Sequence, residues 1–366
     1  MIVATGAKGE FVDREKDFAV LEDASGRIQI INNENFDSAN FVTGSIVSLL
    51  GQADVNGFFI VKDFCYAGIP FKAELPRQVT PQLGPQSLFA PERLNSKREL
   101  IAFTSGFLFG AINEQQETAL WALAHFLRGE HADPTWNALS AQVQRLVVCG
   151  DLVSENKTTD KVERGSYSAQ AINKNYYEEV ADTTDRLEDF MALFIDSIDV
   201  DIMPGVQDFS NSFLPQQPLN SFMFPKIGDK SSLNLVTNPH KFEAFKGIEF
   251  LGTSGQNLRN IEAYCDLEAS TGLDLLKLTL DMRHLCPTAP DTLRTFPFRE
   301  NDPFVIERAP DVYFAGNQDS FGAELVTQTG NSRQGVQLIS VPTFAKTLSI
   351  VLMDTQTLES FELKFN

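Results

Sequence analysis

The sequence has 366 residues, enough for two or three domains with sizeable hydrophobic cores. Its 49 acidic and 30 basic residues give a formal net charge of −19, which opposes non-specific attraction to nucleic-acid phosphates and to anionic lipid. The four cysteines are scattered without a Cys-x-x-Cys pair, so they indicate neither a zinc ribbon nor an iron–sulfur site.

The chain starts with MIVATGAKGEF, which lacks the basic and apolar regions of a signal peptide. No later apolar run reaches the roughly 18 residues that a membrane span requires. We therefore expect a soluble intracellular protein without a membrane partner.

Residues 2–66 contain short β-like runs separated by turn signals, such as Ala24-Ser25-Gly26 and Asn56-Gly57. Five strands without a long helix favour a small barrel, and the OB-fold is the commonest barrel of this size. We predict an OB-fold domain over residues 1–67. Its strands are expected at Ile2–Ala4, Phe18–Leu21, Ile28–Ile31, Ile46–Leu50 and Phe58–Phe64.

Residues 68–98 carry five prolines and little periodicity, which is typical of a linker. Apolar residues recur in it, at Phe71, Leu75, Leu83 and Phe89. A free tether would not expose such residues, so we expect the linker to pack on a surface.

Strands and helices alternate from Glu99 onwards and end in a strand-rich tail, a pattern that predicts a layered α/β domain over residues 99–366. Helices are expected at Gln115–Arg128, Tyr167–Ile195 and Leu273–Leu285. The stretches ELIAFTSGF, RLVVCGD and SIDVDIM are expected to form buried strands that end in loops. Further strands are expected at Asn234–Thr237, Ile248–Leu251, Val312–Phe314, Val336–Val341 and Thr347–Asp354.

The loops after these strands resemble the metal-binding boxes of calcineurin-like phosphoesterases. A two-metal site of that kind needs Asp, Asn and His ligands on loops after successive strands. Here PGVQD stands where such a box reads PGNHD, and GDLVS follows a strand end. The positions that correspond to ligands are Gly106, Leu108, Asp151, Val206, Gln207, Asp208, Asn317 and Asp319.

Most of these positions have lost the chemistry that a metal requires, because glycine, leucine and valine side chains cannot ligate. Asp151 persists, but an aspartate at a strand end commonly caps a turn or helix. A new weak cation site of Asp151, Asp208, Asn317 and Asp319 is the alternative, although the sequence gives no sign that their oxygens converge. The stretch GTSGQN reads as a strand-to-helix turn capped by Ser254. We therefore expect no catalytic residue, no metal and no cofactor.

Several longer runs resemble a specific family, the small (B) subunits of eukaryotic replicative DNA polymerases, and within it the second subunit of DNA polymerase delta. The resemblance covers nearly the whole chain. It rests on DIMPG, LPQQPL, LVTNP, FLGTSGQN, RHLCPTAPDTL and VYFAGNQDSFG, with FVTGSIVSLLG and FIVKDFCYAG as landmarks of the OB domain.

The resemblance implies an OB domain joined to a calcineurin-like phosphoesterase domain without metal ligands. It also implies a non-catalytic nuclear scaffold in DNA replication and repair. The expected partners are the C-terminal domain of the polymerase delta catalytic subunit and a third accessory subunit, with DNA contacted only indirectly. Three alternatives stay open: a divergent metal-dependent phosphodiesterase or nuclease, a free OB protein that binds single-stranded nucleic acid, and a subunit shared with another B-family polymerase.

Overall fold

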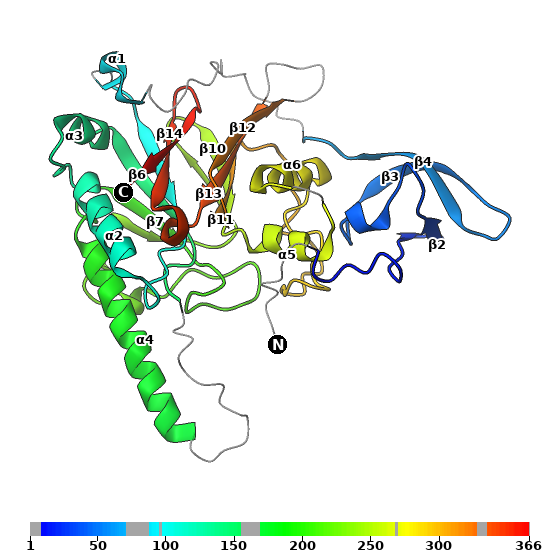
Figure 1. Cartoon of the computed structure of the whole chain (residues 1–366), viewed down its shortest axis with the longest axis horizontal. Coiled ribbons are helices and arrows are strands. Elements are labelled where there is room, and N and C mark those ends of the chain that lie inside the picture. The colour runs from blue at the N-terminus through cyan, green and yellow to red at the C-terminus, as the bar shows by residue number, and fades with distance from the viewer. Residues whose placement is uncertain are drawn as a thin grey trace. The chain divides into compact units, whose positions relative to one another are not determined.

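The computed structural model describes residues 9–70, 88–94, 97–154, 169–267, 270–327 and 335–365 (Figure 1). The chain divides into two compact units. The first unit consists of Met1–Arg77, Gly255–Pro310 and Leu325–Leu338, and the second unit consists of Gln78–Ser254, Asp311–Glu324 and Ile339–Asn366. The proposed boundaries at 1–67, 68–98 and 99–366 remain predictions, and much of the linker, residues 71–87 and 95–96, lies outside the described residues.

The first unit contains a four-stranded sheet in the order β1-β2-β4-β3. Both predicted hairpins form. In the first hairpin the Asp23 carboxylate accepts hydrogen bonds from the backbone N–H groups of Ser25 and Gly26, and in the second Gly57 supplies a φ of 88°. The expected strand Ile2–Ala4 lies outside the described residues. The strands are β1 (Val20–Asp23), β2 (Gly26–Ile31), β3 (Val47–Ala53) and β4 (Phe59–Tyr66), with the short 3-10 helix η1 (Ser38–Asn40).

The first unit also contains two helices, α5 (Gln256–Tyr264) and α6 (Gly272–Met282). The backbone N–H of Asp266, between these helices, donates to the carbonyl of Ala39 at 2.7 Å. Arg283, just after α6, donates from Nε to the carbonyl of Gly68 at 2.6 Å. These bonds tie segments more than 200 residues apart in the chain into one unit.

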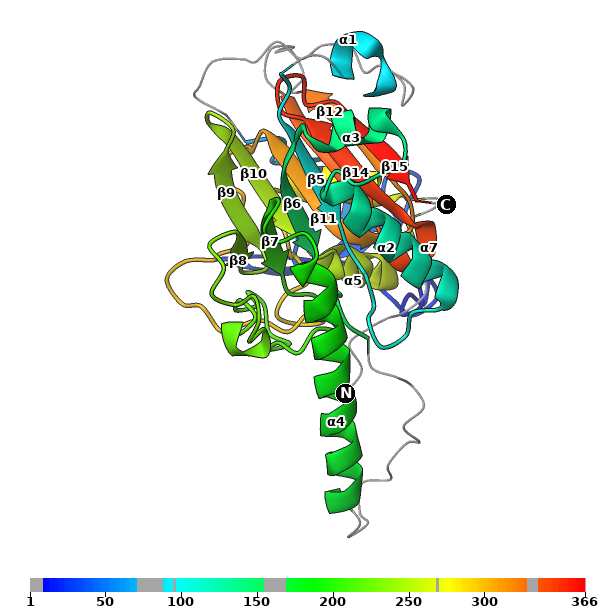
Figure 2. The same cartoon turned by 90° about the vertical axis from the view of Figure 1, so that its left-hand side faces the viewer.

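The second unit contains a six-stranded sheet and most of a five-stranded sheet, and Figure 2 shows their strands spread across the view. The six-stranded sheet has the order β15-β14-β5-β6-β7-β8, and its strands β5 to β8 are parallel. The five-stranded sheet has the order β12-β13-β11-β10-β9. The strands of the first sheet are β5 (Leu100–Thr104), β6 (Val143–Cys149), β7 (Asp199–Met203), β8 (Leu233–Leu235), β14 (Ser349–Asp354) and β15 (Ser360–Lys364). Those of the second are β9 (His240–Ala244), β10 (Ile248–Thr253), β11 (Val312–Gln318), β12 (Gly322–Thr327) and β13 (Gly335–Pro342).

Residues along the central strands β5 and β14 alternate between two cores. In β5, Ile101 and Phe103 pack in a cluster with residues of the five-stranded sheet, whereas Leu100 and Ala102 pack in the cluster that includes the helices. The sheet is thus buried on both faces, which explains why β5 reads as a continuous apolar run. The helices are α1 (Pro91–Leu94), α2 (Glu114–Leu127), α3 (Pro134–Ser140), α4 (Ala169–Ala192) and α7 (Phe344–Thr347), with the 3-10 helix η3 (Ser221–Met223).

The helices expected at Gln115–Arg128, Tyr167–Ile195 and Leu273–Leu285 correspond to α2, α4 and α6. Among the described helices, none combines the length and apolar character that crossing a bilayer requires. One local prediction is wrong: Ser254 does not cap α5. The N-cap is Gly255, whose φ of 87° turns the chain from strand to helix without a side-chain hydrogen bond.

Candidate functional site

The loops that carry the candidate ligand positions lie at the carboxyl ends of strands in both sheets, where ligands bind in layered α/β folds. Backbone hydrogen bonds bring these loops together. The N–H of Gly106, after β5, donates to the carbonyl of Gly150, after β6, at 2.9 Å. Asn317, at the end of β11, donates from Nδ2 to the carbonyl of Cys149 at 3.2 Å. These bonds hold the loops after β5 and β6 and the end of β11 close together.

Asp151 and Asp208 link the loops after β6 and β7 (Asp199–Met203). Asp208 is buried, and its carboxylate accepts from the N–H groups of Asp151, Gly205 and Val153 at 2.9, 2.7 and 3.1 Å. The Asp151 carboxylate accepts in turn from the N–H of Gln207 at 3.0 Å. Burial, and then the negative charge of Asp151, raise the pKa of Asp208 to about 7. Asp151 was expected to cap a local turn, but its carboxylate bonds to a loop 56 residues away in the sequence.

Glycines allow these loops to approach one another closely. A Cβ added to Gly205 would lie 2.2 Å from Oδ1 of Asp151. A Cβ added to Gly106, which has a φ of 64°, would lie 2.5 Å from Cγ2 of Thr343 and 2.8 Å from Oδ1 of Asn317. Neither distance is compatible with a real side chain unless a neighbour moves. The loops are therefore packed against one another at these points.

A row of buried amide groups continues this packing across the site. Gln216 donates from Nε2 to the carbonyl of Gly205 at 3.0 Å, and its Oε1 accepts from Nδ2 of Asn238 at 2.7 Å. Asn238 also donates to Oγ of Ser254 at 2.7 Å, and Asn317 donates to the carbonyl of Ser254 at 3.0 Å. An amide both donates and accepts, so it can join backbone groups in a dry interior without carrying charge. Gln216 and Asn238 lie in LPQQPL and LVTNP, but the sequence did not mark them as part of this site.

The remaining candidate positions do not point to a common centre. Leu108 is half-buried in left-handed backbone, with a φ of 55°, and its N–H donates to the carbonyl of Asp151 at 3.2 Å. Gln207 is exposed, and its Oε1 accepts from Oγ of Ser154 at 2.9 Å. Asp319 is exposed and pairs with Lys346 at 2.8 Å.

These residues do not fit a two-metal centre. The side chains of Gly106, Leu108 and Val206 have no atom that can bind a metal ion. The buried carboxylates of Asp151 and Asp208 already accept hydrogen bonds from backbone N–H groups. Within the ranges that the structure describes, no three His, Cys, Asp or Glu side chains are grouped so that they could hold a metal ion. The expectation that the chain uses neither metal nor cofactor stays a prediction.

Comparison with known proteins identifies the family. The family model for the B subunits of DNA polymerases alpha and epsilon matches residues 101–323, and a model described as DNA polymerase delta subunit OB-fold domain matches residues 2–64. The chain is 33% identical to the DNA polymerase delta small subunit of Arabidopsis thaliana, over 96% of this chain and 73% of that protein. The chain belongs to the family of DNA polymerase delta small subunits. It is also 31% identical to the small subunit of Saccharomyces cerevisiae, over 97% of this chain and 72% of that protein, and 31% identical to subunit 2 of Drosophila melanogaster, over 96% and 74%.

The family assignment confirms two predictions made from the sequence. One is the resemblance to DNA polymerase delta small subunits, and the other is the fold class, an OB-fold domain joined to a mixed α/β sandwich. The match to the OB-fold model spans the region in which the strands β1 to β4 form their sheet.

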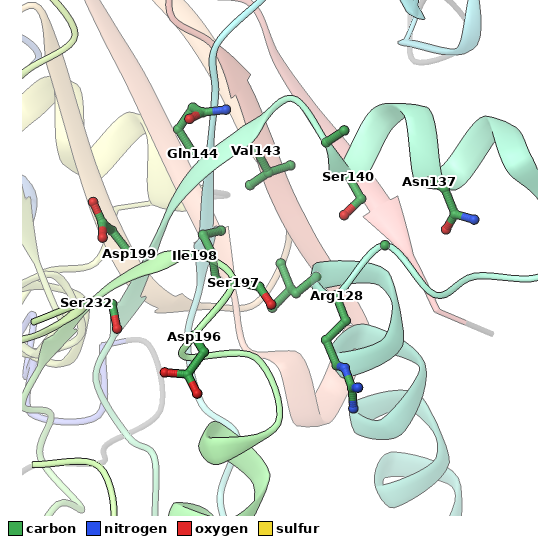
Figure 3. Close-up of a pocket in the computed structure, with 13 residues that line it drawn as sticks. Arg128, Asn137, Ser140, Val143, Gln144, Asp196, Ser197, Ile198, Asp199 and Ser232 are labelled. Atoms are coloured by element: carbon green, nitrogen blue, oxygen red, sulfur yellow. The ribbon is translucent and has the colours of Figure 1, made fainter. Parts of the chain in front are cut away.

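A hollow lies at the other ends of the parallel strands, away from the loops described above (Figure 3). It has a volume of about 580 Å³ and is lined by the end of α2, by α3 and by the residues that precede or begin β6, β7 and β8. Its charged groups are compensated at the surface, because Arg128 pairs with Glu130 at 2.7 Å and Asp196 pairs with Lys230 at 2.8 Å. Ligands in such sheets bind at the carboxyl ends of strands, so we assign this hollow no role.

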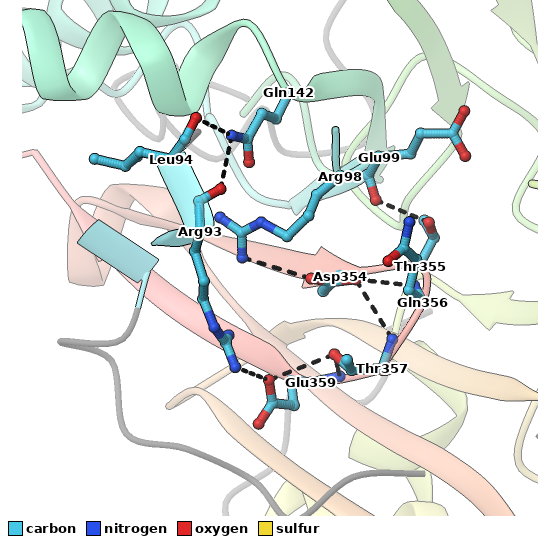
Figure 4. Close-up of polar contacts among 10 residues, drawn as sticks. All are labelled: Arg93, Leu94, Arg98, Glu99, Gln142, Asp354, Thr355, Gln356, Thr357 and Glu359. Atoms are coloured by element: carbon cyan, nitrogen blue, oxygen red, sulfur yellow. Dashed lines mark hydrogen bonds and ion pairs between the residues drawn. The ribbon is translucent and has the colours of Figure 1, made fainter. Parts of the chain in front are cut away.

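A buried ionic cluster, shown in Figure 4, holds the segment before β5 against the turn between β14 and β15. Arg98 is only 8% exposed and pairs with Asp354 at 3.5 Å, and Arg93 pairs with Glu359 at 2.9 Å. Burial lowers the pKa of Arg98 from its ordinary value. The partners are more than 250 residues apart in the sequence, so their pairing could not be predicted from spacing.

Proposed function

We propose that this chain is a non-catalytic accessory subunit of a DNA polymerase delta complex, acting in DNA replication and repair in the nucleus. In this role it bridges the C-terminal domain of the catalytic subunit and a further accessory subunit. The observation that carries the proposal is the 33% identity to a DNA polymerase delta small subunit over 96% of the chain.

The chemistry of the strand-end loops supports a non-catalytic role. Hydrolysis of a phosphodiester by two metal ions needs several carboxylate, amide and imidazole ligands that act together. At the corresponding positions Gly106, Leu108 and Val206 carry no ligand, and Asp208 is hydrogen-bonded to three backbone N–H groups. These loops therefore serve the packing of the second unit.

The charge of the surface supports indirect contact with DNA. The net charge is −19, and the exposed side chains in the part of α4 from residue 178 onwards, where their burial is described, are mainly acidic. This helix extends beyond the sheets in Figure 2. Such a surface repels DNA phosphates but attracts basic segments of proteins. The acidic residues on the exposed part of this helix are Glu178, Glu179, Asp182, Asp185 and Asp189.

Exposed aromatic side chains supply candidate anchors for protein partners. Phe222, in the 3-10 helix η3, is 90% exposed, and Trp121 on α2 is 49% exposed. Protein interfaces concentrate their binding energy in a few aromatic or arginine side chains that become buried in the complex. These two residues are therefore the first to be changed in a search for the interface of the second unit.

Co-expression with the C-terminal domain of the DNA polymerase delta catalytic subunit from the same organism tests the proposal. We expect the two proteins to elute together in gel filtration at micromolar concentration. We also expect the purified chain to bind no manganese and to hydrolyse no phosphodiester. Separate elution of two folded proteins would refute the bridging role, and stoichiometric metal with hydrolysis would favour a divergent phosphodiesterase.

A further inference from the structure

A groove in the first unit has a floor of aromatic side chains. It is formed by two adjoining hollows of about 330 and 640 Å³ that share Asp37, Asn40 and Leu278. Phe41 and Phe64 pack edge to face with their ring centroids 4.8 Å apart, and Phe64 is 38% exposed. The side chains thus present an apolar surface that is open to a ligand.

The rim of this groove is acidic. Glu34, Asp37 and Asp274 line it, and Arg14 is its one basic lining residue among those described. The Arg14 guanidinium is held by Asp37 at 2.5 Å and by Asp266 at 2.7 Å, so its charge is already compensated. The groove therefore has a net negative potential.

These two properties decide which kind of ligand the groove fits. Aromatic side chains on OB-folds can stack with the bases of single-stranded nucleic acid, but such sites also need basic residues along the phosphate backbone. Here the carboxylates would repel phosphates. A guanidinium or ammonium group is attracted both by carboxylates and by the faces of aromatic rings. Exposed amides at Asn35 and Asn40 can hydrogen-bond to the backbone of an extended peptide.

We propose that this groove binds an extended segment of a protein partner in which arginine or lysine alternates with apolar residues. The basic side chains would lie against Glu34 and Asp274, and an apolar side chain would cover Phe64. The proposal goes beyond the assembly role above, since it rests only on groups of the first unit and holds whichever protein carries the segment.

The test uses the full chain and a fluorescein-labelled dodecapeptide in which arginine, leucine and serine alternate, with fluorescence anisotropy as the readout. We expect Phe64→Ala and Glu34→Lys each to raise the Kd at least about tenfold, which corresponds to about 1.4 kcal/mol. Phe298→Ala and Glu307→Lys are matched controls, because they remove an exposed ring or reverse an exposed charge outside the groove. They should change the Kd less than about twofold.

Three results would overturn the proposal. The first is no binding of the peptide to the wild-type chain, and the second is equal weakening by the groove variants and the controls. The third is tighter binding of a labelled dodecathymidylate that is lost in the groove variants, which would make the groove a nucleic-acid site. Glu34 is exposed, so Glu34→Lys keeps the test valid if Phe64→Ala fails to fold. Co-elution with the polymerase catalytic subunit is measured separately, and its failure would leave this result unaffected.

Discussion

Gly106 offers a direct test of the tight packing between the strand-end loops. Its φ of 64° is left-handed, which costs a residue with a Cβ about 1–2 kcal/mol. In Gly106→Ala the Cβ would also lie 2.5 Å from Cγ2 of Thr343 and 2.8 Å from Oδ1 of Asn317, and such overpacking typically costs about 1–3 kcal/mol more. We expect Gly106→Ala to lower the free energy of unfolding by about 2–5 kcal/mol. Gly106→Asp, which places a carboxylate at the position that corresponds to a phosphoesterase ligand, should lower it further because a carboxylate is buried.

Urea denaturation measures these changes, and Gly129→Ala provides the control. Gly129 has a φ of 71°, but its added Cβ would meet nothing within 4 Å, so this variant reports backbone strain alone and should lose about 1–2 kcal/mol. Manganese should not raise the urea midpoint of Gly106→Asp. Equal stability of Gly106→Ala and Gly129→Ala would refute the packing argument, and stabilisation of Gly106→Asp by manganese would show that the ligand set can still be completed.

Further predictions concern the buried polar groups. Asn238→Leu removes the hydrogen bonds that Asn238 makes with Gln216 and Ser254 in the buried network, so we expect the free energy of unfolding to fall by about 2–4 kcal/mol in urea denaturation. A loss below about 1 kcal/mol would contradict the network. Burial raises the pKa of Asp208 to about 7, so between about pH 4 and pH 7 the folded chain keeps a proton on this carboxyl group that the unfolded chain has released. The contribution of Asp208 to the free energy of unfolding therefore falls as the pH rises from about 4 to 7. The wild-type chain should exceed Asp208→Asn in free energy of unfolding by about 2 kcal/mol less at about pH 8 than at about pH 5.5. A difference that stays constant over this pH range would exclude the raised pKa. Asp354→Ala leaves Arg98 buried without its carboxylate and should cost about 3–5 kcal/mol in thermal or urea unfolding. The exposed Asp319→Ala should cost less than about 1 kcal/mol, and similar losses for both variants would contradict the role of burial.

The sequence predicted those elements whose signal is local. The five residues of β5 (Leu100–Thr104) are all buried, so they appear as a continuous apolar run. The helix α2 (Glu114–Leu127) carries a capping box between Asn113 and Gln116 at its start, and its predicted bounds differ by one residue at each end. Strong hydrophobic runs and caps act within one turn or one strand, so they can be recognised without the rest of the chain.

The edge strand β9 escaped prediction because its partner strand supplies most of its stability. β9 (His240–Ala244) has only partly buried or exposed side chains and pairs antiparallel with β10, and no strand was predicted at these residues. Burial lowers the pKa of His240, and its ring stacks on Phe242 with centroids 4.7 Å apart. A short polar strand of this kind is recognisable only when its neighbour is known.

In the candidate site, too, some features could be predicted from the sequence and others could not. The absence of ligands at Gly106, Leu108 and Val206 could be read from the sequence, because a metal ligand depends on residue type at a motif position. The amides of Gln216 and Asn238 could not be assigned, because their partners come from loops that meet only in the folded chain. Residue type at a motif position can be judged from the sequence alone, whereas contacts between distant loops require the structure.

Affinity purification of the tagged chain from its native cells, followed by quantitative mass spectrometry, tests the proposed assembly role most directly. We predict that the chain is recovered with the catalytic subunit of DNA polymerase delta in equal amounts, through washes at the salt concentration of the cell. Recovery of the chain alone, or in equal amounts with a different polymerase and without the delta catalytic subunit, would contradict the proposed role.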